Sequence, residues 1–263
     1  MRIAGLTFSH ANAKIEALIQ VPELRRFLAD GRTVYSFDLL SGHSCPFARD
    51  CKSRAVVGDD GRRHIEDGPE TEFRCFSASQ EVQYTNVYNV RAGNFENLRG
   101  LTTEQIVERI LAAMPDDLGI CRIHVGGDMF SEAYLLAWVE IARRNPDRLY
   151  YAYTKSLPYW VANRALIEAT PNLVLTASRG GRRDDLIESH GLRSVKVCYS
   201  EAEAAGLPID HDDSHAACPS LRGDDFALLL HGTQPKGSEA AEALKALKRD
   251  GVKHSYSRKT AAV

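Results

Sequence analysis

A regular alternation of short apolar runs and amphipathic helical patterns is the feature of this sequence that most restricts its fold. The strand-like apolar runs are residues 33–40, 121–125, 149–153, 173–177, 195–199 and 226–230. Helical patterns occupy residues 103–114, 131–144, 159–169, 183–190, 201–205 and 239–249. Neighbouring parallel strands must be joined by long crossovers, which are usually helices. The alternation therefore predicts an α/β fold with about six mostly parallel strands, as a partial (β/α) barrel or a doubly wound sheet.

The chain has 263 residues, which is enough for one large α/β domain with a single core. We expect this domain to span residues 1–254 and a polar, flexible tail to follow at residues 255–263. Residues 41–80, between the first two predicted strands, form a turn-rich segment that contains cysteines. Its GDDGRR motif predicts a turn or a short hairpin.

Charge and hydropathy restrict the compartment and the partners. The formal net charge is −2, so no basic field favours nucleic-acid binding. No run of about 18 apolar residues suggests a membrane span, and the N-terminus lacks the apolar core of a signal peptide. We expect a cytoplasmic protein. In a reducing compartment, grouped cysteines indicate metal binding or catalysis before disulfides.

Three of the six cysteines fall between the first and second predicted strands. Cys45, Cys51 and Cys75 could bring several thiolates to one centre, and Cys218, like Cys45, is followed by proline. Iron–sulfur clusters and zinc both accept thiolates, and the spacing lacks the closely paired cysteines of a zinc ribbon, which slightly favours a cluster. The remaining two cysteines lie inside predicted strands and are expected in the core: Cys121 and Cys198.

The segments that directly follow the predicted strands should lie together. In a parallel sheet the carboxyl ends of the strands share one edge, and binding residues gather there. The segments concerned are SGHSCPFARDC, GGDMFS, TKSLP, SRGGRRDD and HGTQPKG. We expect them to form the functional site, with His43 and His231 as further candidates from the first and last of them.

Within these segments, Gly126, Gly127 and Asp128 form a turn in which the backbone could approach a ligand and the carboxylate could accept from an amine. The alternative is a tight strand-to-helix turn with Asp128 as a helix cap. Lys155 follows the next strand and is expected at the mouth of the site. A group of arginines could bind an anion, or could be a solvated charged loop: Arg179, Arg182 and Arg183.

The strand FDLL followed by a cysteine loop, and the strand CRIHV followed by GGD, together resemble the start of a radical SAM enzyme. The resemblance implies a radical-SAM-like partial barrel in which Cys45, Cys51 and Cys75 hold a [4Fe-4S] cluster. It also implies that residues 126–128 contact the amino group of S-adenosylmethionine. Radical SAM enzymes usually have three cysteines within eight residues. The spacing here departs from that pattern, because Cys75 lies more than twenty residues after Cys51.

A second set of motifs is similar to the gene product 88 family of phages and actinobacteria. The motifs are SGHSCPFARDC, FRCFSASQE, the NF of AGNFENL, RIHVGGDMFS, YAYTKS, and the CP before LLLHGTQPKG, spanning residues 37–237. They cover most of the chain. This resemblance implies membership of the family but no particular reaction. If a phage encodes the protein, we expect it in the cytoplasm of the bacterial host.

Several functions fit these observations. The first is an iron–sulfur protein whose [4Fe-4S] cluster is held by Cys45, Cys51, Cys75 and Cys218, with a redox, sensing or structural role. The second is a radical SAM-type enzyme with a three-cysteine cluster and S-adenosylmethionine. The third is a zinc-binding or nucleic-acid-binding phage protein. The partner would be a redox protein or a small molecule, with nucleic acid less favoured and no membrane.

Overall fold

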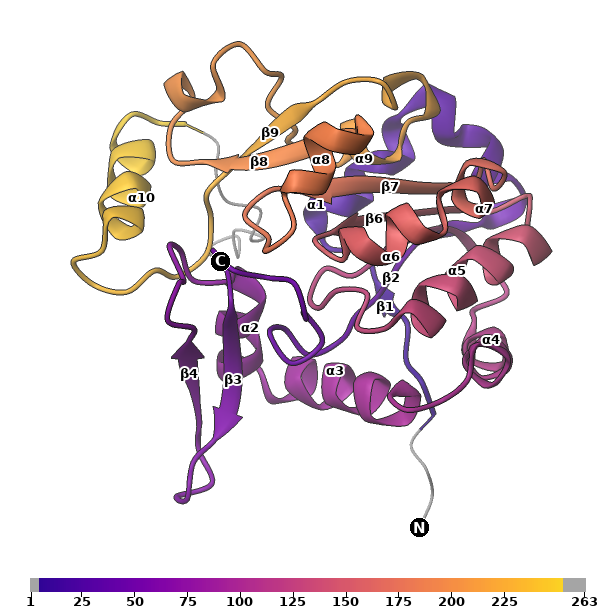
Figure 1. The fold of residues 1–263 in the computed structure, drawn as a ribbon, viewed down its shortest axis with the longest axis horizontal. Helices are drawn as coiled ribbons and strands as arrows, with labels where there is room; N and C mark the ends of the chain where they lie inside the picture. The colour runs from indigo at the N-terminus through magenta and orange to yellow at the C-terminus, as the bar shows by residue number, and fades with distance from the viewer. Residues whose placement is uncertain (1–4, 253–263) are drawn as a thin grey trace, which may run out of the picture.

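A mostly parallel sheet forms the centre of the molecule, which we describe from a computed structural model over residues 5–252 (Figure 1). In this part of the chain the sheet has seven strands, in the order β1-β2-β5-β6-β7-β8-β9. Their bounds are Ser9–His10 (β1), Thr33–Phe37 (β2), Leu118–Ile123 (β5), Leu149–Thr154 (β6), Leu173–Ser178 (β7), Ser194–Cys198 (β8) and Phe226–Leu229 (β9). The predicted α/β class and all six predicted strands are confirmed.

The strand order follows the chain. From β2 to β9 each strand pairs in parallel with the next one in this sheet, and β1 adds an antiparallel edge beside β2. The order does not reverse in the middle, as it does in a doubly wound sheet. Within residues 5–252 the edge strands β1 and β9 do not pair with each other, so no barrel is closed.

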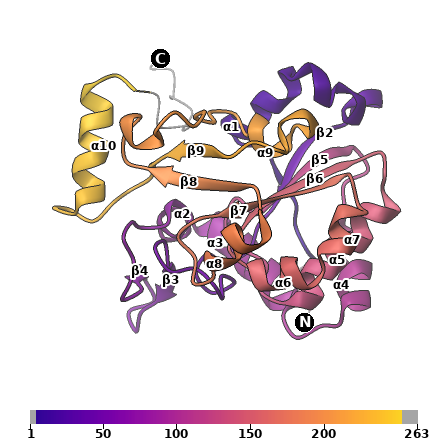
Figure 2. The ribbon, with the colours of Figure 1, turned by 45° about the horizontal axis from the view of Figure 1, so that its top comes forward.

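Helices between the strands cover one face of the sheet (Figure 2). They are α4 (Thr103–Ala113), α5 (Glu132–Arg144), α6 (Leu157–Ala162), α7 (Arg164–Glu168) and α8 (Asp185–His190). The Thr102–Gln105 capping box and the Ser131 cap form as the sequence predicts. The helix predicted over residues 159–169 is instead broken at Asn163, whose side chain donates to the carbonyl of Tyr159 at 2.9 Å.

Short helices that the sequence did not predict cover the opposite face. They are α1 (Ala13–Glu16), η1 (Ala17–Gln20), η2 (Pro22–Phe27), η3 (Ala29–Gly31), α9 (Ser214–Ala217) and η5 (Pro219–Leu221). Ile15, Leu18, Leu24 and Phe27 bury their side chains against this face of the sheet. Because these turns are only three to six residues long, they give no sustained helical period.

The remaining elements flank the sheet. A hairpin of β3 (Ser53–Val57) and β4 (Arg63–Asp67) projects from one end, as GDDGRR predicts (Figure 1). Helices α2 (Phe76–Gln83) and α3 (Thr85–Leu98) follow it. After β8 the predicted helix at residues 201–205 is a 3-10 turn, η4 (Ala202–Ala204), and the last helix is α10 (Glu239–Arg249). The tail expected at residues 255–263 lies outside the described residues.

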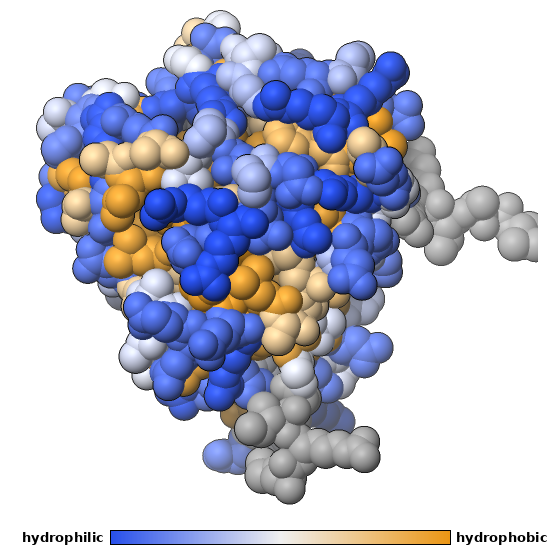
Figure 3. All heavy atoms as spheres, turned by 90° about the vertical axis from the view of Figure 1, so that its right-hand side faces the viewer, coloured by the Kyte–Doolittle hydropathy of each residue, from blue (hydrophilic) through white to orange (hydrophobic). Residues whose placement is uncertain are grey.

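Polar side chains interrupt the apolar ones on the face that Figure 3 shows. In residues 5–252, large apolar side chains with high exposure are scattered along the sequence: Ile19, Val57, Tyr84 and Leu166. No helix in this range is long and apolar enough to cross a lipid bilayer.

Two glycines allow a matched test of the packing. A Cβ at Gly119, in β5, would overlap the carbonyl oxygen of Phe27, whereas a Cβ at Gly93, inside α3, would meet nothing within 4 Å. We expect Gly119→Ala to lower the free energy of unfolding by about 2 kcal/mol or more, because backbone must move. Gly93→Ala should raise it by roughly 0.5–1 kcal/mol, because alanine favours a helix. Urea denaturation measures both, and equal effects would contradict this packing.

Candidate metal and ligand site

The loops after five strands line a cavity of about 1060 Å³ at the carboxyl edge of the sheet. They contribute the residues Cys45 and Cys51 after β2, Gly126–Asp128 after β5, Lys155 after β6, Ser178 at the end of β7, and His231–Thr233 after β9. Cys75, which precedes α2, lines the same cavity. The edge predicted from the strand order is therefore where the motif residues gather.

The Cys45–Cys51 loop is held by the loop after β7. The backbone N–H groups of Arg49 and Asp50 donate to the carbonyl of Gly180 at 3.2 and 3.1 Å, and Ala48 pairs with Gly181. Gly180 has φ +88°, and a Cβ there would lie 2.6 Å from the Asp50 carboxylate. Glycine is therefore required for this close approach.

The β3–β4 hairpin returns the chain to its starting point, which brings Cys75 back to Cys51. The carbonyl of Asp50 accepts from the N–H groups of Glu72 and Phe73, at 2.8 and 3.1 Å. The N–H of Cys75 donates to Ser53 Oγ at 3.2 Å. The two ends of the hairpin segment are therefore hydrogen-bonded to each other. Cys75 and Cys51 are brought together in space although they are far apart in the sequence.

Gln234 holds the same segment from the other side. Its amide oxygen accepts from the N–H of Arg74 at 2.7 Å, and its amide nitrogen donates to the carbonyl of Arg74 at 3.0 Å. This pair of hydrogen bonds ties the loop after β9 to the residue before Cys75. The sequence analysis included the HGTQPKG segment in the site but did not assign this role to Gln234.

The thiols lie close enough to affect one another. Burial raises the pKa of Cys45 well above its ordinary value, and Asp128, Cys75 and Cys51 raise it further. Burial and Cys51 raise the pKa of Cys75 to about 11. Backbone N–H groups favour the thiolates, since Gly42 donates to Cys45 Sγ at 3.3 Å. Several thiolates here would repel one another unless a positive centre neutralised them.

Cys218 does not join this group. It is 3% exposed and packs with Ala216, Ala217 and Phe226 in the core on the opposite face of the sheet. The segment after Cys218 lies at the amino ends of the strands. Its Arg222 side chain donates to the carbonyl of Pro171, just before β7. The structure therefore does not assemble the predicted four-cysteine set. The strand cysteines are buried as expected: Cys121 and Cys198.

The glycines of the Gly126–Asp128 turn are required by packing. A Cβ at Gly126 would lie 2.7 Å from the Arg91 guanidinium, and one at Gly127, at φ +97°, would lie 2.7 Å from Leu39 and Ser44. Buried Asp38 fixes the turn, since its carboxylate accepts from the N–H groups of Val125 and Gly126 at 2.5 and 3.2 Å. Asp38 was not identified from the sequence, because it falls inside the predicted strand at residues 33–40, whereas the observed strand β2 ends at Phe37.

Asp128 and Lys155 join neighbouring loops. The buried Asp128 carboxylate accepts from Met129 N at 2.7 Å, Thr154 Oγ1 at 2.6 Å and Lys155 N at 2.9 Å. Lys155 Nζ donates to Ser178 Oγ at 2.6 Å and to the carbonyl of Arg179 at 2.8 Å. Both residues line the cavity, as expected, but most of their hydrogen-bonding capacity is used within the protein.

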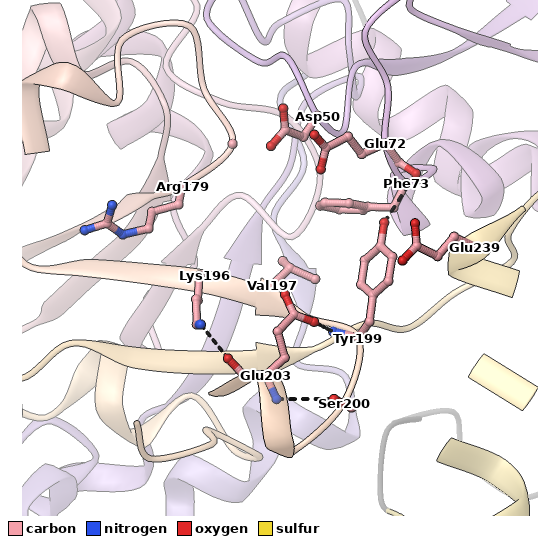
Figure 4. Close-up of a pocket in the computed structure, with 11 residues that line it drawn as sticks. Asp50, Glu72, Phe73, Arg179, Lys196, Val197, Tyr199, Ser200, Glu203 and Glu239 are labelled. Atoms are coloured by element: carbon pink, nitrogen blue, oxygen red, sulfur yellow. Dashed lines mark hydrogen bonds between the residues drawn. The ribbon is translucent and has the colours of Figure 1, made fainter. Parts of the chain in front are cut away.

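The arginines of the loop after β7 are paired with carboxylates. Arg179 pairs with Glu188 at 2.6 Å, Arg183 pairs with Asp185 at 3.0 Å, and Arg182 pairs with Glu70. A neighbouring pocket of about 860 Å³ is lined by carboxylates that include Asp50, Glu72, Glu203 and Glu239 (Figure 4). Partial burial and these carboxylates raise the pKa of Tyr199 to about 12. Such surroundings disfavour nucleic-acid phosphates.

A buried network around Asp213 lies behind the cavity. Its carboxylate accepts from Lys14 and Arg122 at 2.9 and 2.6 Å, and from the hydroxyls of Tyr151 and Tyr153 at 2.9 and 3.2 Å. Burial opposes ionisation of Asp213, but the two cations keep its pKa below the ordinary value. The sequence gave no signal for it, because the partners come from α1, β5 and β6.

His43 and His231 have different surroundings. His43 is exposed, and its Nε2 contacts the carbonyl of Ala55 at 2.9 Å, which ties it to β3. His231 lines the cavity and packs against Phe76, with ring centroids 4.6 Å apart. Burial lowers the pKa of His231 to about 4, so it is neutral at pH 7.

These features define an α/β protein with a mostly parallel sheet and a thiol-bearing cavity at its carboxyl edge. The sequence model described as "Gene product 88" matches residues 6–250, so the chain belongs to the gene product 88 family. It is 26% identical to a Gene 88 protein of Mycobacterium phage D29 over 64% of this chain and 70% of that protein. It is 30% identical to a Gene 88 protein of Mycobacterium phage L5 over 31% of this chain and 38% of that protein. No solved structure matches.

Asp210, beside the Asp213 network, makes stability depend on pH. Burial raises its pKa to about 6, which exceeds the value of an unfolded aspartate. Its stabilising contribution is complete below the unfolded pKa and is lost as pH rises through about 6. Relative to wild type, Asp210→Asn should therefore gain roughly 2 kcal/mol of unfolding free energy between about pH 4 and pH 7.

Urea denaturation at a series of pH values measures this difference. Asp212→Asn is the control. Partial burial raises the pKa of Asp212, but hydrogen bonds from Ser214 outweigh it and lower the pKa, which predicts no such gain. Parallel pH profiles for wild type and Asp210→Asn would contradict the assignment.

Proposed function

We propose that this protein binds an iron–sulfur cluster through Cys45, Cys51 and Cys75 and presents the cluster to a small molecule in the same cavity. The observation that carries the proposal is the convergence of these cysteines, from two separated segments, on one cavity. The proposal uses three cysteines and not four, because Cys218 is buried in a separate core cluster and does not line the cavity.

The donor set fits such a group. Thiolates are the usual ligands of iron–sulfur clusters, and N–H groups directed at the sulfurs tune them. Gly42 supplies one such donor to Cys45, and the first turn of α2 supplies donors to Cys75. The raised pKa values of Cys45 and Cys75 describe the metal-free thiols, and a cationic core would favour their ionised forms.

Zinc is the competing metal, because it also binds three or four thiolates. Within residues 5–252, no group of three or more His, Cys, Asp and Glu side chains is placed to hold a metal ion. The proposal is carried by the cysteines that line one cavity, and metal analysis of the purified protein distinguishes a cluster from zinc.

The scaffold supports the further proposal of a radical-SAM-like half-barrel. The strand order is sequential, the cysteine loop follows β2, and the Gly126–Asp128 turn follows β5 beside it. A cluster held by three cysteines has one iron without a protein ligand, and when bound it would supply an electron and a coordination position. S-adenosylmethionine is the candidate ligand, because Gly126, Gly127 and Asp128 line the same cavity as the cysteines.

Cysteine substitutions test the ligand set. After anaerobic purification or reconstitution, the wild type should contain about four iron atoms per chain and absorb near about 400 nm. Cys45→Ala, Cys51→Ala and Cys75→Ala should each lose most of this iron, because each removes a ligand. Cys218→Ala should keep it, and so should the matched buried variant Cys121→Ala. Iron and sulfide analysis, with circular dichroism as a check on folding, measures the outcome.

Loss of iron from folded Cys218→Ala, but not from Cys121→Ala, would support the four-cysteine set and contradict our proposal. Colourless wild-type protein with one zinc ion would exclude the cluster itself.

Electron paramagnetic resonance tests the open iron. Adding S-adenosylmethionine to the reduced protein should change the spectrum of the cluster, because an unligated iron gains new ligands. Adenosine, which lacks the amino and carboxylate groups, should leave the spectrum unchanged and serves as the control. An unaltered spectrum in protein that contains about four iron atoms would contradict S-adenosylmethionine binding and leave a structural or electron-transfer cluster.

A further inference from the structure

The cavity wall continues along β5 from the Gly126–Asp128 turn to Arg122, and we call the part around Arg122 the second end of the cavity. Lys14 from α1 and Tyr153 from β6, which contact Asp213 together with Arg122, also line the cavity. Arg122 lies four residues before Gly126, which places it at most about 13 Å further down the sheet than the turn. A molecule of moderate size could therefore contact both ends of the cavity.

Arg122 is held in a fixed orientation. Its Nε donates to the carbonyl of His124 at 3.1 Å, its Nη1 donates to Asp213 at 2.6 Å, and its guanidinium stacks on the ring of Tyr153 at 5.0 Å. Among the described residues, Nη2 has no hydrogen-bond partner. It is also not one of the polar side-chain atoms that are both fully buried and without a partner. Since the side chain is 12% exposed and lines the cavity, Nη2 is the atom it offers to a ligand.

Arg122 is the charged group that this part of the wall presents to an anion. The Asp213 carboxylate is fully buried and accepts from Lys14, Arg122 and two tyrosine hydroxyls. Asp210, which interacts with Lys14, forms no part of the cavity wall within residues 5–252. An oxyanion bound to Nη2 would therefore meet the guanidinium at the cavity surface, whereas these acids do not line the cavity.

Apolar side chains also belong to the cavity wall. Val197 from β8, Leu228 and Leu230 from β9 and its following residue, and Leu244 from α10 line it. A small polar ion alone would leave these side chains without a partner. A ligand with an acidic group and a hydrocarbon body would satisfy both parts of the wall.

We infer that this end of the cavity binds a small organic acid, whose carboxylate or phosphate meets Arg122 and whose apolar body packs against Val197, Leu228 and Leu230. The inference rests on the proposed function only in making this acid the substrate of the cysteine site. Binding itself requires no cluster.

Methyl-labelled nuclear magnetic resonance of leucine and valine tests the inference in the wild-type protein. Hexanoate and hexyl phosphate are the probes for the two possible acidic groups, and hexanol and hexylamine are the neutral and cationic controls. We expect the better of the two anions to shift the methyl signals of Val197, Leu228 and Leu230 and to bind about ten-fold more tightly than hexanol, which corresponds to one charge-assisted hydrogen bond. Equal binding of hexanol, or shifts confined to other methyl groups, would overturn the inference.

Arg122→Gln removes the charge and should abolish the preference for the anion over hexanol. Arg143→Gln, which removes an exposed arginine of α5, should leave the preference intact. If Arg122→Gln fails to fold, the wild-type shifts and the hexanoate–hexanol comparison still decide the question.

The same titration of Cys75→Ala separates the two proposals. Anion binding that persists there, together with an absence of iron in the wild type, would support the acid site and exclude the cluster. Iron in the wild type without any preference for the anions would support the cluster and exclude the acid site.

Discussion

The site depends on one closure, the pair of hydrogen bonds that the carbonyl of Asp50 accepts from Glu72 and Phe73. Cys51 and Cys75 are separated by a complete hairpin, and without this closure their thiols would belong to different parts of the surface. Joining the ends of such a loop costs entropy, and the cost rises only slowly with loop length. Hydrogen bonds from Ser53 and Gln234 to the segment around Cys75 offset part of it. A cysteine spacing that looks too wide for a common centre is therefore compatible with one.

Buried carboxylates hold the other loops in place. Asp38 binds the turn after β5, Asp128 joins that turn to β6, and Asp213 pairs with Lys14 of α1 and Arg122 of β5. Each carboxylate is at most 5% exposed and accepts several hydrogen bonds, which is the condition under which a buried charge is tolerated. Removing one partner would leave the others unpaired, so these networks fix the loops more strictly than apolar contacts would.

The sheet could be predicted from the sequence because strands buried on both faces appear as continuous apolar runs. The edge that carries the site followed from their parallel order, which also brought Gly126–Asp128 and Lys155 to the cavity. The position of Cys218 could not be predicted in this way, because it depends on the short turns at residues 13–31 and 214–221, which have no periodic signal. The saturation of Lys155 and Asp128 by neighbouring loops was equally hidden, since it arises from contacts between segments far apart in the sequence.

Strand β5 links the two ends of the cavity. Its register with β2 and β6 fixes Arg122 within the sheet, and its carboxyl end fixes the Gly126–Asp128 turn beside the cysteine loop. The interval between the acid-binding end and the thiols is therefore set by backbone pairing and not by flexible side chains. A ligand anchored at Arg122 would reach the thiols at a position determined by its own length. The selectivity of such a site would thus depend on the size of the ligand as well as on its charge.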